Sequence, residues 1–218
     1  TTKNSKAEID EAVDYIGANL STGPTGGFAS SLTKHTDKVL SLFSDVILKP
    51  AFPESEFEKI KTQTLSGLQT EKDDPNAISG NVSNALTYGT THPYGEITNE
   101  STVSNISLED CKNYYNTYFK PGNAYLVIVG DITPEAAKTK AEKYFGSWPA
   151  GKTPEYEYAF PKGVDNTSVA FIDKSGAVQS VINITYALDL KPGAPDVIPA
   201  RVMNTILGSG FSGRLFKN

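Results

Sequence analysis

Apolar side chains recur every three or four residues along much of the chain, and this spacing predicts amphipathic helices. The predicted helices cover residues 6–17, 36–49, 53–72, 76–88, 108–118, 134–145 and 194–207. Polar residues that favour helix starts precede several of them. Ser5 is followed by Glu8 at the spacing of a capping box, and Ser107 precedes the helix from residue 108. Thr133 stands before Pro134, a residue well suited to the first helical position.

The clearest strand candidate is the apolar run from Ala124 to Val129, which is rich in β-forming residues. A continuous run of this kind predicts a strand that is buried on both faces. Gly130 and Asp131 end the run, and the apolar residues of the helix over 134–145 are expected to pack back on the sheet. Such a strand needs neighbours, which other parts of the chain must supply.

Four shorter stretches are also predicted to form strands. Residues 19–22 and 28–33 flank a glycine-rich turn over 23–27. Residues 167–173 and 179–187 flank a second turn over 174–176 and are consistent with a hairpin.

A change in composition suggests where the chain divides. Residues 150–163 contain proline and glycine and show no periodicity, which indicates a linker. We therefore predict one domain over residues 1–155 and the start of a second domain over 156–218. The chain begins without methionine and stops inside a predicted helix, so we expect a fragment of a longer protein.

Composition and charge narrow the class of partner. The net charge is −5 and charges of both signs are interspersed, so nothing in the electrostatics favours nucleic acid. No apolar run approaches the about 20 residues that a membrane-spanning helix needs, and we predict no membrane span. Cys111 is the single cysteine, so an internal disulfide is excluded. With no histidine nearby in sequence, it is interpreted as a buried structural thiol.

The residues that could bind a metal are few. Zinc sites in enzymes use at least three protein ligands. The two histidines, His35 and His92, occur in no H-x-x-E-H or H-x-x-H spacing, and both are interpreted as structural. We therefore expect neither a metal site nor another cofactor in this chain.

A glycine-rich segment, residues 208–213, matches the spacing G-x-G-x-x-G. A dinucleotide site requires this pattern after a strand, whereas here it follows a predicted helix. Two other interpretations remain open. The segment is either a flexible loop that approaches an extended peptide or a helix end followed by a tight turn. In the first case Gly208, Gly210, Phe211 and Gly213 are the candidate peptide-binding residues.

Several long segments resemble one protein family. The stretch NAYLVIVGDITPEAAKTKAEKYFGSWP, residues 123–149, is similar to the closing strand and helix of the peptidase M16 family, which includes insulinase, pitrilysin and mitochondrial processing peptidase. HPYGEITNESTVSNISLEDCKNYYNTYF and ILGSGFSGRLFKN resemble other M16 segments, and the similarity extends over the whole chain. The resemblance implies an α+β fold of the M16 (LuxS/metallopeptidase-like) type. Such a fold has two-layer domains with an antiparallel-rich sheet and helices on one face.

The resemblance also tests for catalysis. Active family members carry H-x-x-E-H on one helix and a zinc-binding glutamate on a later helix. The first motif would precede Thr1, and alignment of the later helix puts Gly67 at the glutamate position. The segment over 22–28 is also shorter than in active members. Both departures predict a non-catalytic half of an M16 pair, with zinc bound by the active subunit.

Three functions remain open on this basis. In the first, the chain helps enclose and bind extended peptide substrates, by strand pairing, beside an M16 subunit or half that carries H-x-x-E-H. The second is an active zinc metalloendopeptidase whose H-x-x-E-H lies upstream of Thr1. The third is a structural or scaffolding homologue. The bacterial-looking form of the segments implies a periplasmic or cell-envelope location.

Overall fold

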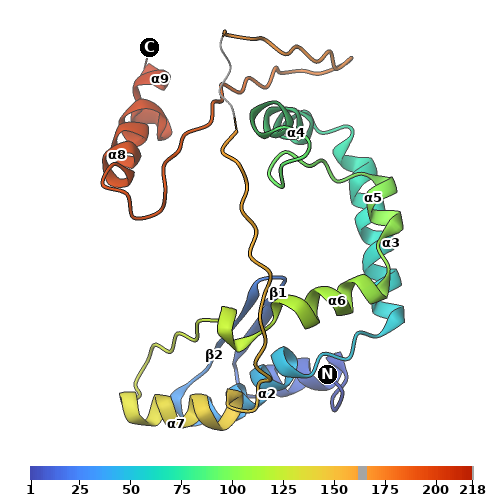
Figure 1. Ribbon diagram of the computed structural model, residues 1–218, viewed down its shortest axis with the longest axis vertical. Coiled ribbons are helices and arrows are strands. Elements are labelled where there is room, and N and C mark those ends of the chain that lie inside the picture. Colours follow the sequence, from blue (N-terminus) through green and yellow to red (C-terminus); the bar gives the residue numbers. More distant parts are fainter. Residues whose placement is uncertain (162–165, 218) are drawn as a thin grey trace. The chain divides into compact units, whose positions relative to one another are not determined.

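The computed structural model describes residues 1–161 and 166–217 (Figure 1). These residues form two compact units. The first contains residues 1–68 and 99–156, and the second contains residues 69–98 and the described residues from 157 onward. The division into domains over 1–155 and 156–218 stays a prediction.

The first unit is built mainly from helices around one small sheet. Its elements are α1 (Lys6–Tyr15), β1 (Asn19–Gly23), β2 (Gly26–Ser30), η1 (Thr33–His35), α2 (Thr36–Leu48), most of α3 (Glu54–Glu71), α5 (Glu100–Asn105), α6 (Leu108–Tyr118), η2 (Pro121–Asn123) and α7 (Pro134–Phe145). The second unit contains α4 (Pro75–Tyr88), α8 (Val197–Gly208), η3 (Gly210–Ser212) and α9 (Arg214–Lys217). The predicted helices are confirmed, with ends shifted by up to three residues.

Capping side chains set the starts of these helices. The backbone N–H of Ser5 donates to Glu8 Oε2 at 2.7 Å, and the Ser5 hydroxyl accepts from the Glu8 N–H, which confirms the capping box. Thr133 caps α7 as predicted. Helix α5 was not predicted, because its six residues carry one apolar side chain and no helical periodicity. A capping box between Asn99 and Thr102 starts it.

The sheet is an antiparallel pair of strands. β1 and β2 pair from Asn19↔Ser30 to Gly23↔Gly26, and the two-residue loop Pro24–Thr25 joins them. Together with the helices, this sheet confirms the α+β fold class.

The core of the first unit lies where α1 and α2 pack beside the sheet. Its buried residues are Ile9, Val13, Ile16, Ala18, Val39 and Leu42. Gly27 on β2 permits a close approach of α2, because a Cβ there would lie 2.7 Å from a ring carbon of Phe43 and 2.9 Å from the Ser21 carbonyl oxygen.

Helix α7 packs on a different element from the one predicted. Its main contact is with α2, at the lower edge of Figure 1. The rings of Phe43 and Phe145 meet edge to face with centroids 6.0 Å apart. Tyr144 donates to Asp37 on α2 at 2.8 Å. The last two residues of α7, Tyr144 and Phe145, therefore pack it against α2.

The apolar run 124–129 does not form the predicted buried strand. It is extended, pairs with no other strand among the described residues, and leaves Tyr125 99% and Val129 91% exposed. The prediction was wrong because an apolar, β-forming sequence supplies only one side of a ladder. A strand also requires a hydrogen-bonded partner strand, and none pairs with this run within the described part of the chain.

The second predicted hairpin also lacks its ladder. Residues 167–173 and 179–187 are extended without strand pairing, although the turn is present, with Ala177 N–H donating to Lys174 O at 3.2 Å. Polar side chains hold the second stretch to α4 instead. Asn183 Nδ2 donates to Ser79 Oγ at 2.8 Å, and the hydroxyls of Thr87 and Thr185 lie 3.0 Å apart. Of the predicted linker, residues 150–161 contain no helix or strand, and residues 162–163 lie outside the described residues.

Candidate peptide-binding surfaces

The position expected to carry the third zinc ligand is a glycine on α3. Gly67 is exposed, and a Cβ built on it would meet no atom within 4 Å. Across residues 1–161 and 166–217, no group of three or more His, Cys, Asp or Glu side chains could hold a metal ion. The residues described do not fit a zinc site, and no metal-dependent step is assigned to them.

The two histidines occupy different units. His35 lies at the N-terminal end of α2 and makes no side-chain cap hydrogen bond there. His92 Nδ1 accepts the Tyr94 N–H at 3.1 Å, and its ring stacks on Tyr88 with centroids 5.4 Å apart. Tyr158 meets the same imidazole edge to face. His92 therefore holds together a turn and an aromatic cluster of the second unit.

The glycine-rich segment follows α8 directly. Gly208 is the last residue of α8, Gly210 starts η3 with φ of 62°, and α9 follows. Gly213 is buried, and a Cβ added there would lie only 3.0 Å from the Gly208 carbonyl carbon. Phe211 is 82% exposed and touches Phe216, with ring centroids 5.0 Å apart. This geometry matches a helix end followed by a tight turn, and peptide binding by these residues stays a prediction.

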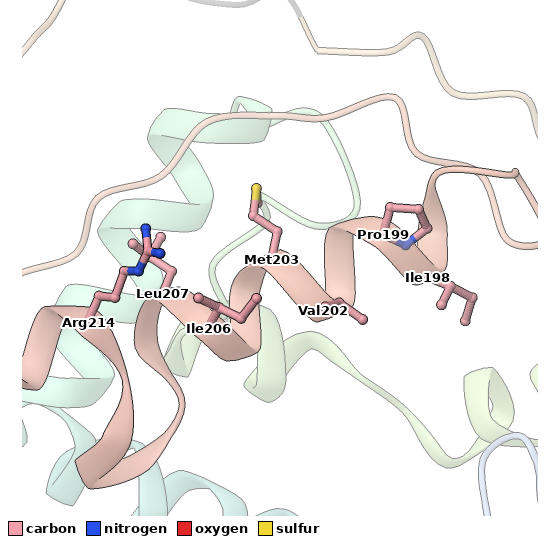
Figure 2. A pocket seen from close by; sticks show the side chains of 7 residues that line it. All are labelled: Ile198, Pro199, Val202, Met203, Ile206, Leu207 and Arg214. Carbon is pink, nitrogen blue, oxygen red and sulfur yellow. The ribbon is translucent and has the colours of Figure 1, made fainter.

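Next to this segment, α8 presents an open apolar surface. Figure 2 shows its side chains along the helix, with Arg214 beyond the C-terminal end. They line an open pocket of about 730 Å³, whose residues are Ile198, Pro199, Val202, Met203, Ile206, Leu207 and Arg214. Met203 is 59% exposed, so this face of α8 is open to water in the described part of the chain.

In the first unit, the β1–β2 hairpin has unpaired outer edges. Within the described residues each strand pairs only with the other. Residues 15–33, which include both strands, carry no charged side chain. Proteins usually protect an exposed edge with lysine, proline or a bulge, because its free N–H and C=O groups would pair with another strand. The only proline of this stretch, Pro24, lies in the loop. Within the part of the chain that the structure describes, the edges are therefore open to pairing.

An apolar pocket of about 540 Å³ lies beside the end of β1. Its lining comes from the hairpin, the end of α2, the following loop, the residue after α5 and one face of α6. These residues are Thr22, Gly23, Pro24, Val46, Ile47, Pro50, Phe52, Ile106, Asp110, Cys111, Tyr114, Tyr115 and Phe119. Tyr114 and Tyr115 of α6, with Phe119 just after it, form one aromatic wall. Cys111 is half-buried in this wall, whereas the sequence predicted a buried thiol.

Two tyrosines fix the pocket wall to the surrounding backbone. The Tyr114 hydroxyl donates to Pro24 O at 3.2 Å, and the Tyr115 hydroxyl donates to Ile47 O at 2.8 Å. Burial raises the pKa of Tyr115. Phe52 lies against Tyr115 with ring centroids 5.5 Å apart. Sequence reasoning missed this pocket because its wall residues lie far apart along the chain.

A polar cluster joins α2 to α7 on the outside of the first unit. Asp37 accepts from Lys140 Nζ at 2.7 Å, from Lys143 Nζ at 3.4 Å and from the Tyr144 hydroxyl. The Lys140 and Tyr144 hydrogen bonds hold the pKa of Asp37 well below its usual range. The cluster is exposed and stabilises a helix pair, so it is not a candidate binding site.

Comparison with known proteins identifies the family of this chain. Residues 105–218 match the family model described as the peptidase M16 inactive domain. The match covers more than half of the chain, so the chain belongs to the peptidase M16 family. Gly67 lies outside the matched residues, so its assignment to the ligand position stays a prediction.

The chain is similar to two curated proteins and to one protein of known crystal structure. The non-peptidase homolog YmxG of Helicobacter pylori is 22% identical over 85% of this chain and 43% of its own length. An uncharacterized zinc protease of Rickettsia felis is 26% identical over 100% of this chain and 53% of its length. The crystal structure of a peptidase M16 inactive domain from Pseudomonas fluorescens matches with a TM-score of 0.80 at 22% identity, covering 99% of this chain and 53% of that one. The chain thus spans about half the length of these relatives.

No helix within the described residues is both long enough and apolar enough to cross a membrane.

Proposed function

We propose that this chain is the non-catalytic half of an M16 protein and that it binds extended peptides beside a zinc-bearing M16 subunit or half. The observation that carries the proposal is the uncharged, unpaired edge of the β1–β2 hairpin. An extended peptide binds such an edge by adding a strand, and the main-chain hydrogen bonds supply affinity for many sequences.

The register of the hairpin indicates which backbone groups would bind the peptide. In a two-residue hairpin the residues that flank the loop, here Gly23 and Gly26, form a hydrogen-bonded pair. Pairs then alternate along the strands. Leu20 and Thr22 on β1 therefore direct their N–H and C=O groups outward, as do Gly27 and Ala29 on β2. A peptide strand on β1 would bond to Leu20 and Thr22.

The missing ligand supports the non-catalytic assignment. Hydrolysis at a zinc centre needs three protein ligands, and Gly67 contributes no donor atom. The name non-peptidase homolog, given to one relative, supports the same assignment. Catalysis would then belong to the partner that carries H-x-x-E-H.

A second candidate function is favoured by the name of the Rickettsia relative. That protein is named a zinc protease and aligns over the entire chain. In this alternative the chain is part of an active zinc metalloendopeptidase whose H-x-x-E-H lies upstream of Thr1. A scaffolding homologue, the third possibility, would bind no peptide.

Peptidase assays with and without a partner separate these functions. The protein is tested alone, with an M16 partner carrying H-x-x-E-H, and with both after chelation of zinc. The proposal predicts hydrolysis of an extended peptide only in the mixture, and loss of hydrolysis on chelation. Zinc-dependent hydrolysis by the protein alone would favour the endopeptidase. If the protein neither binds the peptide nor changes the partner's activity, the scaffolding function is favoured.

A further inference from the structure

The pocket beside β1 has features that a side-chain pocket for a bound peptide requires. We infer that it receives a large apolar or aromatic side chain of the peptide paired with β1. This inference rests on the proposed peptide-binding function and adds to it the class of peptide that is preferred.

The pocket lies on a face that a peptide side chain would reach. The Thr22 methyl and the Phe43 ring both lie close to the same side of Gly27, at 3.2 and 2.7 Å from the Cβ position. The side chain of Thr22 therefore points to the face of the hairpin that α2 covers. Alternate side chains of a strand point to the same face, and neighbouring strands lie about 4.8 Å apart. Every second side chain of a peptide on β1 would thus point to the face where Thr22 and Gly23 line the pocket.

The chemistry of the lining selects an apolar occupant. Both tyrosine hydroxyls already donate to backbone carbonyls. The Asp110 carboxylate accepts two hydrogen bonds from Ser107, one from its N–H at 2.8 Å and one from its hydroxyl at 2.6 Å. These bonds belong to the capping box of α6. Among the described residues, no lysine, arginine or histidine lines the pocket. An acidic side chain would lose its water, find no cation and lie near Asp110, so it is disfavoured.

The size and the walls favour an aromatic ring over a small side chain. The pocket has a volume of about 540 Å³, which is far more than the methyl group of an alanine side chain could fill. Phe52, Tyr115 and Phe119 present ring faces and edges, which pair well with another aromatic ring. Burial of a phenylalanine side chain should strengthen binding about tenfold or more relative to alanine.

The test uses three peptides that differ at one position, carrying Phe, Ala or Asp, in a fluorescence anisotropy titration of the full chain. The Phe peptide should bind about tenfold tighter than the Ala peptide, and the Asp peptide weaker than both. Equal binding of the three, or tightest binding of the Asp peptide, would overturn the inference and leave the proposed function intact. Binding of none would defeat the proposed function and the inference with it.

Substitutions at one wall residue locate the preference. Cys111→Phe fills the pocket from α6 and should reduce the Phe-to-Ala affinity ratio to about one, with the Ala peptide still bound. Lys138→Ala, an exposed position on α7 outside the pocket lining, is the control and should keep the ratio. Should Cys111→Phe not fold, Ile106→Ala, which removes part of the apolar wall, should lower the ratio about threefold. A ratio unchanged by folded Cys111→Phe or by Ile106→Ala would show that the preference arises elsewhere.

Discussion

Asp37 on α2 accepts a hydrogen bond from Lys140 on α7 at 2.7 Å, although 103 positions separate the two residues in sequence. The same carboxylate accepts from Tyr144, one helical turn further along α7. This contact and the Phe43–Phe145 edge contact join the two helices. The α7 segment is thus held to the first unit by side chains, while the extended run before it pairs with no strand of the described chain.

Loss of the Asp37 contact should weaken the first unit mildly. Asp37→Asn keeps the shape but removes the charge, and because the pair is exposed the thermal midpoint should fall by only about 1–4 °C. Lys138→Ala removes an exposed pair within α7, between Lys138 and Glu142 at 3.9 Å, and serves as the control. Its midpoint should change less. A larger fall for Lys138→Ala than for Asp37→Asn would contradict this account.

The same carboxylate predicts the direction of a pH dependence. The folded pKa of Asp37 is lowered, so its contribution to stability is fully present above the ordinary aspartate pKa of about 3.9. The contribution is lost as pH falls from that value through the lower folded pKa. Unfolding midpoints of the parent and Asp37→Asn should therefore converge as pH falls below about 4. A difference that grows on acidification would refute the assignment.

Gly67→Glu tests whether one missing carboxylate explains the missing metal site. Gly67 lies in the interior of α3 with open space around it, so the substitution should stabilise the helix by about 0.5 kcal/mol. One carboxylate supplies one of at least three ligands, so zinc affinity should not appear in this chain. Urea unfolding and zinc titration against a chelator measure the two effects, with Gly67→Ala as the propensity control. Tight stoichiometric zinc binding by the unmodified chain would overturn this interpretation.

Two glycines of the hairpin should respond differently to alanine. Gly27→Ala places a methyl 2.7 Å from the Phe43 ring and should destabilise the first unit by about 1–3 kcal/mol. Gly23→Ala, in the partner strand, meets no atom within 4 Å and should have a small effect. Chemical denaturation of both variants compares them. If Gly27→Ala lowers the free energy of unfolding as little as Gly23→Ala does, α2 does not pack closely on β2.

The tyrosine pair of the pocket wall gives another matched comparison. Tyr115→Phe removes the donor to Ile47 O, which lies in a partly buried contact, and should cost about 0.5–1.5 kcal/mol. Tyr114→Phe removes a longer and more exposed bond to Pro24 O and should cost less. Urea unfolding distinguishes the two. The reverse order would mean that the Tyr115 hydrogen bond contributes little.

Local signals explain what could be predicted from the sequence. The Ser5, Ser107 and Thr133 caps and the apolar spacing of the helices depend on neighbours within four residues, so their predictions were confirmed. The similarity to M16 proteins likewise depends on contiguous segments, and the family match confirms it over residues 105–218.

Contacts between distant segments explain what could not be predicted. The run 124–129 has the composition of a strand, but strand pairing depends on a second segment that its own residues do not specify. The choice of α2 as the partner of α7 depends on Asp37 and Phe43, far from Lys140 and Phe145 in sequence. The pocket beside β1 similarly combines the hairpin with α6.

The central claim is that the outer edge of β1 binds an extended peptide, and two proline substitutions test it most directly. Thr22→Pro removes an outward N–H of β1 without removing a β1–β2 hydrogen bond, and Ala29→Pro does the same on β2. Peptide affinity is measured by anisotropy, with circular dichroism and thermal midpoints as checks of folding. The account predicts about tenfold weaker binding for folded Thr22→Pro and parent-like binding for Ala29→Pro. Parent-like peptide affinity in folded Thr22→Pro would contradict it.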